Sequence, residues 1–213
     1  MKALALSGVG SLLCLGAHSD DIEIGCGGTV LRLLEANPGA VVHWVVFSAR
    51  ADRAREAEAS AARFLAGARE RQVELHQFRD GFFPSEIARI KTYYEELKGR
   101  IQPDLILTHH RDDLHQDHRV VCELTWNTFR NHGILEYEIP KWDGDLGRPN
   151  LYVPLTEEQA GRKVAILMEC FGTQAGKHWF DAETFNALMR LRGLECNAAA
   201  RRAEAFYGRK VVL

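Results

Sequence analysis

The sequence lacks the features that mark several classes of protein. Its five cysteines form no CxxC pair, and their odd number and wide spacing argue against a disulfide framework or a zinc knuckle. The 27 Lys and Arg nearly balance the 29 Asp and Glu, so a net charge of −2 creates no field that would recruit nucleic acid. No apolar run approaches the roughly 18 residues of a membrane span. Free thiols suit a reducing compartment, and we expect a cytoplasmic location.

The start of the chain allows two interpretations. Lys2, followed by the apolar run from Ala3 to Ala17, has the charged start and apolar centre of a secretory signal. Glycines interrupt this run, however, and cleavage near Ala17 would remove the segment that delivers His18. A buried parallel strand is the better explanation, because such strands are apolar on both faces.

The periodicity of the chain predicts an α/β fold. Strand-like and helix-like segments alternate at spacings of roughly 25 to 30 residues, which indicates βαβ units on a mostly parallel sheet. With 213 residues and no repeat or linker, we expect a single domain over 1–213. The predicted strands are 12–17, 41–47, 73–78, 105–108 and 134–139, and the predicted helices are 29–35, 53–65, 84–98, 120–130, 158–169, 182–191 and 198–207.

Two stretches rich in histidine and aspartate each follow a predicted strand. The first runs from His18 through Asp20 and Asp21 into a glycine cluster, and the second, 108–119, holds four histidines and three aspartates. Ligands bind beyond the carboxyl ends of parallel strands, so we expect the two stretches to meet at one edge of the sheet. Adjacent carboxylates repel each other, and a divalent metal is the simplest counter-charge that also uses the histidines.

The spacing of these residues predicts a hydrolytic metal site. His18 and Asp21 are three residues apart, as are His115 and His118, so each pair faces one direction if it lies on a first helical turn. One His and one Asp from the first stretch, with one His from the second, make a two-histidine, one-carboxylate set. Such sites commonly leave a fourth position open for water, whose pKa falls towards about 7 on the metal.

The remaining polar residues of the two stretches suit acid–base chemistry. Asp20, next to a ligand, is the natural base for the activated water. The spare histidine is expected to polarise the substrate carbonyl, with a carboxylate such as Asp117 orienting its ring.

The two stretches resemble the LmbE-like (PIG-L) family of zinc-dependent N-deacetylases. Its AHPDD motif after the first strand and its later HxDH motif are similar to AHSDDIEIGCGGT (17–29) and DLHQDHR (113–119). Residues 55–58 resemble the family's Arg-x-x-Glu helix, and 192–193 and 204–206 resemble its C-terminal signatures.

The sequence departs from the family pattern at two positions. Ser19 stands where the family usually has proline, but no metal ligand is lost with it. Ile22 stands where many relatives carry Glu, and Glu23 follows one place later.

The resemblance implies a Rossmann-like three-layer sandwich and a role for each motif residue. Asp20 is the implied general base, which later returns its proton to the leaving amine. His115 is the implied electrophilic partner, with Asp117 beside it. The residues implied to bind one Zn²⁺ per chain, with Fe²⁺ as the alternative metal, are His18, Asp21 and His118.

The resemblance also implies a substrate: an N-acetylated amino sugar such as N-acetylglucosamine, or its conjugate, which would lose its acetyl group. Two alternatives stay open, namely hydrolysis of another amide or ester and a non-catalytic sugar- or metal-binding protein. Asp20 argues against the second alternative, because a pure metal binder needs no base. Family analogy makes a homo-oligomer plausible. The candidate substrate-binding residues are Arg50, Arg53, Arg55, Trp142 and His178.

Overall fold

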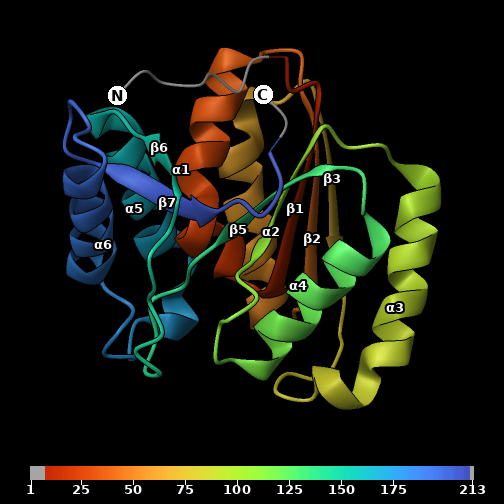
Figure 1. Cartoon of the computed structure of the whole chain (residues 1–213). Coiled ribbons are helices and arrows are strands. Elements are labelled where there is room, and N and C mark those ends of the chain that lie inside the picture. The colour runs from red at the N-terminus through yellow and green to blue at the C-terminus, as the bar shows by residue number, and fades with distance from the viewer. Residues whose placement is uncertain (1–7, 212–213) are drawn as a thin grey trace.

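Runs of β-branched and aromatic residues form a seven-stranded, mostly parallel sheet in the computed structural model, which describes residues 8–211 (Figure 1). The strand order is β3-β2-β1-β4-β5-β7-β6, and β7 pairs antiparallel with both β5 and β6. The strands are β1 (Ser11–His18), β2 (Val41–Ser48), β3 (Glu70–Leu75), β4 (Leu105–His109), β5 (Gly133–Tyr137), β6 (Leu151–Pro154) and β7 (Ala203–Tyr207).

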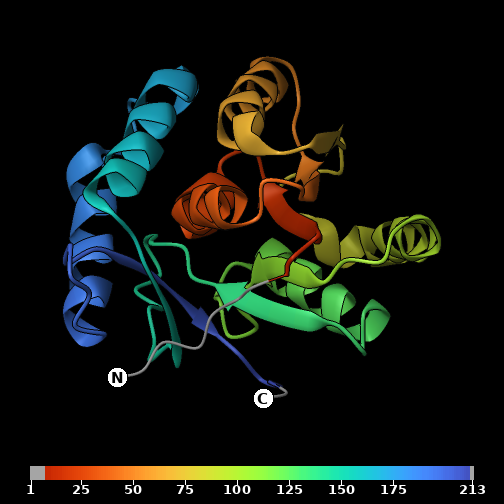
Figure 2. The same cartoon turned by 90° about the horizontal axis from the view of Figure 1, so that it is seen from above.

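Helices cover both faces of the sheet and complete the three-layer sandwich (Figure 2). Alternate residues of β2 divide between the two layers: Trp44 packs in the same cluster as Phe64 of α2, and Phe47 in the cluster that contains Tyr94 of α3. No helix in the described range is both long and apolar enough to cross a membrane. One face of the sheet carries α1 (Asp21–Ala36), α2 (Asp52–Phe64), α5 (Glu157–Cys170) and α6 (Ala182–Glu195). The other face carries α3 (Phe83–Arg100) and α4 (Gln116–Thr128). Two short 3-10 helices are η1 (Leu65–Gly67) and η2 (Gly172–Gln174).

Helix α1 begins eight residues before the predicted helix, so the glycine cluster lies inside it. A Cβ atom at Gly25 would lie 2.2 Å from the ring of Tyr137, and one at Gly27 would lie 2.7 Å from the ring of Phe64. The Tyr137 hydroxyl in turn donates to the Leu15 carbonyl at 2.6 Å. The glycines therefore allow α1 to lie close to the sheet and to α2.

The C-terminal segment corrects one prediction. The helix predicted over 198–207 is wrong, because Ala203–Tyr207 forms β7 within the sheet. Asn197 and Arg201 have φ values of +53° and +54°, which a continuous helix does not allow. The alanine-rich composition favours a helix, but sheet pairing and burial of β7 override this weak preference. Strand β6 was not predicted.

The sheet opens between β1 and β4, where the chain changes its winding direction. The two strands pair from Leu12 opposite Leu105 only as far as Cys14 opposite Leu107, although β1 continues to His18. Open parallel sheets bind their ligands beyond the carboxyl ends of the strands, at the place where the winding direction changes.

Candidate metal centre

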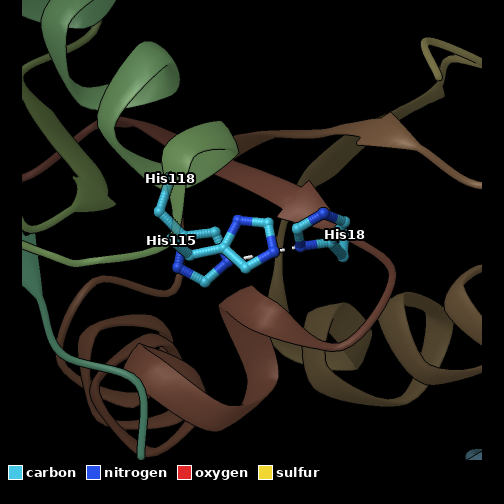
Figure 3. A group of neighbouring side chains, drawn as sticks. All are labelled: His18, His115 and His118. Atoms are coloured by element: carbon cyan, nitrogen blue, oxygen red, sulfur yellow. Dashed lines mark hydrogen bonds between the residues drawn. The ribbon is translucent and has the colours of Figure 1, made fainter. Parts of the chain in front are cut away.

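Several possible ligand atoms meet at this opening, where Figure 3 shows the rings of His18, His115 and His118 side by side. The atoms of His18, Asp21 and His118 come closest to the spacing of a metal's ligands. His18 ends β1, Asp21 begins α1, and His118 lies on the first turn of α4. The Nδ1 atom of His18 lies 3.2 Å from both Asp21 Oδ2 and His118 Nε2, and the latter two atoms are 3.5 Å apart. Ligand atoms about 2.1 Å from a tetrahedral zinc are about 3.4 Å from one another. The trio therefore fits a tetrahedral ion with one further position for water or substrate.

Each of the two histidines has its other ring nitrogen next to a carboxylate. Nε2 of His18 lies 3.3 Å from Asp117 Oδ2 and 3.1 Å from Asp80 Oδ1, whereas Nδ1 of His118 lies 3.0 Å from Asp113 Oδ2. Such partners fix the tautomer of a metal-binding histidine and the orientation of its ring.

Asp80 and Asp113 were not predicted as site residues. The available signal was position: Asp80 lies after β3 at the sheet edge that carries the metal centre, and Asp113 lies in the same loop as His115.

The pKa shifts favour the metal-binding protonation state of Asp21 and His118. Burial alone would raise the pKa of Asp21, but the imidazoles of His118, His109 and His18 hold it well below its usual range. Burial, and next the nearby His109, lowers the pKa of His118 to about 3. At neutral pH the carboxylate is therefore ionised and the His118 ring is neutral. For His18 the shift is opposite: burial would lower its pKa, but the carboxylates of Asp21, Asp117 and Asp80 raise it well above its usual value, so a metal there would have to displace a proton.

His109 provides a competing arrangement, because its Nε2 lies 3.1 Å from Asp21 Oδ2. That nitrogen, however, accepts the backbone N–H of Ala17 at 3.0 Å, so its lone pair is already used. The ring also stacks on His118, with centroids 3.9 Å apart. His109 thus closes the gap between β1 and β4 and supports His118 rather than binding the metal.

Asp20 has one carboxylate oxygen engaged and one free. Arg53 donates to Oδ1 at 2.7 Å, whereas Oδ2 is buried without a hydrogen-bond partner among residues 8–211. Burial raises the pKa of Asp20, although Arg53 opposes this change. A carboxylate with a raised pKa and a free oxygen is well suited to accept a proton.

His115 lies beside the trio, with its ring centroid 4.9 Å from that of His18 and 4.5 Å from that of His118. Its Nδ1 accepts the backbone N–H of Asp117 at 3.2 Å, so the neutral ring carries its proton on Nε2. Burial, and next the charge of His18, lowers the pKa of His115, which favours this neutral donor form.

The expectation that Asp117 orients the ring of His115 is not met. Its carboxylate contacts His18 instead, and it also accepts the backbone N–H groups of Gly81 at 2.7 Å and Phe83 at 3.0 Å. Asp117 therefore connects His18 to the β3–α3 loop.

Of the three arginines predicted to contact substrate, only Arg53 reaches the centre. Arg50 is exposed and donates to the Gln77 carbonyl at 2.8 Å, and exposed Arg55 pairs with Asp52. The Arg-x-x-Glu pair that faces the site is consequently Arg53 and Glu56, at 3.9 Å, and not the pair within 55–58.

Trp142 and His178 lie on different loops, β5–β6 and α5–α6, and contact each other. Their ring centroids are 3.8 Å apart and both residues are exposed. The structure thus brings these two predicted residues together as a pair.

The two residues that depart from the family pattern, Ser19 and Ile22, are both fully buried, and so is the Glu23 that follows the second. Ser19 is fully buried, and its hydroxyl donates to the Ser48 carbonyl at 3.5 Å. Glu23 is also fully buried, with no hydrogen-bond partner for its carboxylate in the described part of the chain, and burial raises its pKa well above the usual value.

The predicted C-terminal signatures support α1 and β5 from outside the centre. Glu204 accepts the backbone N–H groups of Gly28 at 2.9 Å and Thr29 at 2.6 Å, and it pairs with buried Lys163 at 2.6 Å. Arg192 forms a buried two-point pair with Glu138, just after β5, at 2.7 Å for both contacts.

Comparison with known proteins gives one family and several related structures. The family model described as GlcNAc-PI de-N-acetylase (PIG-L) matches residues 13–129, more than half of the chain. No curated protein matches in sequence.

Three solved structures illustrate the similarity of fold. The conserved protein TT1542 from Thermus thermophilus is 19% identical, with 96% of each chain covered and a TM-score of 0.73. The N,N'-diacetylchitobiose deacetylase from Pyrococcus horikoshii is 19% identical over 94% of this chain and 84% of that one, with a TM-score of 0.68. The 4-carboxy-2-hydroxymuconate hydratase from Pseudomonas putida is 19% identical over 95% and 97%, with a TM-score of 0.71.

Proposed function

Because the chain belongs to the GlcNAc-PI de-N-acetylase (PIG-L) family, we propose that it is a metal-dependent hydrolase that removes an acetyl group from an N-acetylated amino sugar or its conjugate. One observation carries the proposal: a three-ligand set with tetrahedral spacing lies beside a buried carboxylate that has a free oxygen. A binding protein has no need of that carboxylate, whereas a hydrolase requires a base at this place.

His18, Asp21 and His118 would hold the metal. A zinc ion bound there, or iron(II) in its place, would supply a Lewis acid that polarises the amide carbonyl and makes water acidic enough to be deprotonated near pH 7.

Asp20 moves the proton in this proposal. Its free Oδ2 accepts a proton from the attacking water, because Arg53 occupies Oδ1 and leaves one oxygen available. The protonated carboxyl group then gives this proton to the nitrogen of the amine as the amide bond breaks, which restores the ionised carboxylate.

His115 stabilises the negative charge that develops on the carbonyl oxygen. Its Nε2–H is available as a donor because Nδ1 is engaged by the backbone of Asp117. A preorganised donor of this kind typically contributes about 10²- to 10³-fold to kcat.

The amino-sugar class is supported by the family and by the name of the Pyrococcus relative, a diacetylchitobiose deacetylase. The exposed ring pair Trp142 and His178 would offer a surface for a sugar or its aglycone. A cytoplasmic location, a single-domain organisation and a homo-oligomeric state remain predictions.

The rival activities differ in their products. Hydrolysis of another amide or ester would use the same groups on a different acyl compound. The similarity of fold to a hydratase adds a second rival, because addition of water to a carbon–carbon double bond also needs a base but releases no acetate.

The deciding experiment measures acetate released by the zinc-loaded protein from N-acetyl sugars, nucleotide sugars and glycosides. The proposal expects acetate and free amine in equal amounts from at least one of these classes. Absence of both products across the panel, from a protein that holds one zinc per chain, would overturn the deacetylase assignment.

A further inference from the structure

The β5–β6 loop carries two largely buried charges that contact the β4–α4 loop. Within the exposed stretch 141–148, the side chains of Lys141 and Asp145 are only 10% and 6% exposed. Lys141 and Asp145 pair with each other, and Asp145 Oδ2 also accepts the backbone N–H of Leu114 at 2.7 Å. Lys141 Nζ donates to Asp113 Oδ2 at 2.9 Å. The loop is therefore attached at two points to the β4–α4 loop.

The carboxylate of Asp113 connects this attachment to a metal ligand. The same Oδ2 that accepts from Lys141 lies 3.0 Å from Nδ1 of His118, and Oδ1 accepts the backbone N–H of His115 at 2.7 Å. Asp113 is 2% exposed, so water does not compete freely for these contacts. One buried side chain thus separates the lysine from the imidazole that faces the metal.

Removal of Lys141 would leave Asp113 with an uncompensated buried charge. A buried carboxylate that loses its cation is strongly destabilised and tends to move towards water. Such a movement weakens the acceptor that holds the proton of His118 on Nδ1, and only this tautomer leaves Nε2 free to bind a metal.

We propose that Lys141 is a positioning residue that couples the β5–β6 loop to metal binding through Asp113 and His118. Because coupling between two equilibria is reciprocal, a metal on His118 stabilises the closed loop by the same factor by which the closed loop tightens the metal. Trp142 follows Lys141 directly, so contact of a substrate with this part of the loop would also tighten metal binding.

The inference depends on the metal centre of the proposed function and not on its deacetylase reaction. The test therefore uses zinc alone, without substrate. Zinc affinity is measured by chelator competition, and hydrogen exchange of a peptide covering 141–150 is followed with and without zinc.

The key variant is Lys141→Met, which keeps the length of the side chain and removes its charge. Replacement of a residue that hydrogen-bonds to a metal ligand typically weakens metal binding by 10- to 100-fold. Lys141 lies one residue further from the metal, so we expect about tenfold weaker zinc binding. In the wild-type protein zinc should slow exchange in the loop by a similar factor, and in Lys141→Met this protection should be lost. Lys98→Met, which removes an exposed lysine of α3, is the matched control and should behave as wild type.

Two results would overturn the proposal: zinc affinity of Lys141→Met within twofold of wild type, or loop exchange in the wild-type protein that zinc does not change. Should Lys141→Met fail to fold, as judged by circular dichroism, Asp145→Ala decides in its place. That variant removes the acceptor of the Leu114 N–H and so breaks the second attachment of the loop; unchanged zinc affinity in it would overturn the coupling. A wild-type protein that binds zinc but releases no acetate would refute the activity alone.

Discussion

The two histidines proposed to bind the metal are supported in different ways. His18 faces Asp117, whose carboxylate is fixed by two backbone N–H groups, that of Gly81 in the β3–α3 loop and that of Phe83 at the start of α3. His118 faces Asp113, whose carboxylate accepts one backbone N–H, that of His115, and depends for its counter-charge on a lysine side chain from the β5–β6 loop. Backbone donors are fixed by the fold, whereas a lysine side chain can leave with its loop. The centre thus combines one rigid half with one half that depends on the position of a loop.

The largest effect is expected from replacement of either histidine, and it should be equally large for the two halves of the centre. His18→Ala and His118→Ala each delete a ligand, so zinc binding should be lost and activity should fall by about 10⁴-fold or more whichever half is hit. Metal analysis after dialysis, with parallel acetate assays, checks this. If either variant retained one zinc per chain, that histidine would not be a ligand.

The variant Asp20→Asn should impair the reaction without disturbing the carboxylates that support His18 and His118. Asp20 binds neither the metal nor the ring of a metal-facing histidine, so zinc content should stay at one per chain while kcat falls by about 10²- to 10⁴-fold. Asp112→Asn, at a carboxylate whose side chain is 80% exposed, serves as the control and should keep normal turnover. Full activity of Asp20→Asn would exclude Asp20 as the base.

Asp117→Asn and Asp113→Asn compare the two halves directly. Each should weaken zinc binding by about 10- to 100-fold, because each removes the anion behind a metal-facing histidine. In the metal-free protein, Asp117→Asn should in addition cost about 1–3 kcal/mol of stability, since an amide has a single acceptor oxygen for the Gly81 and Phe83 N–H groups.

Zinc affinity is measured by chelator competition, and the stability of the metal-free protein is measured by thermal unfolding in the presence of chelator. Lys98→Met serves again as a control for both. Equal unfolding temperatures of metal-free Asp117→Asn and wild type would remove the proposed rigidity of the His18 half.

The smallest expected effect belongs to Asp80. Its side chain is 77% exposed, and His18 keeps Asp117 when Asp80 is replaced. An exposed ion pair contributes at most about 1 kcal/mol, so Asp80→Asn should change zinc affinity by less than about fivefold. A loss as large as that of Asp117→Asn would mean that the two carboxylates support His18 equally.

Periodicity predicted the first half of the fold because each element there buries its own repeating face. The runs within β1 and β2 are apolar on both sides, and the polar clusters at their carboxyl ends mark the open edge. The last helix was mispredicted because 198–207 is rich in alanine, and only the neighbouring strands decide its conformation.

The predicted metal trio shares one face of the opening, but its supporting partners were not accessible from spacing. Lys141 reaches Asp113 from the β5–β6 loop, and an irregular loop leaves no periodic pattern in the sequence from which its contacts could be predicted. For the arginine the signal was present: Ala57, Ala61 and Phe64 form the buried face of α2, and the position four residues before Ala57 is Arg53 and not Arg55.

The distance along the chain between the parts of the centre has a consequence for its synthesis. His118 follows His18 by 100 residues, and Glu204, which holds the backbone of α1, follows Gly28 by 176. At about 5–20 residues per second a ribosome adds His118 roughly 5 to 20 s after His18, and Glu204 roughly 9 to 35 s after Gly28. During the first interval the newborn chain carries two neighbouring carboxylates without His118, and during the second α1 lacks the contact that Glu204 makes with its backbone. The three residues of the proposed metal site are therefore present together only after more than half of the chain has been made, and the support of α1 follows later still.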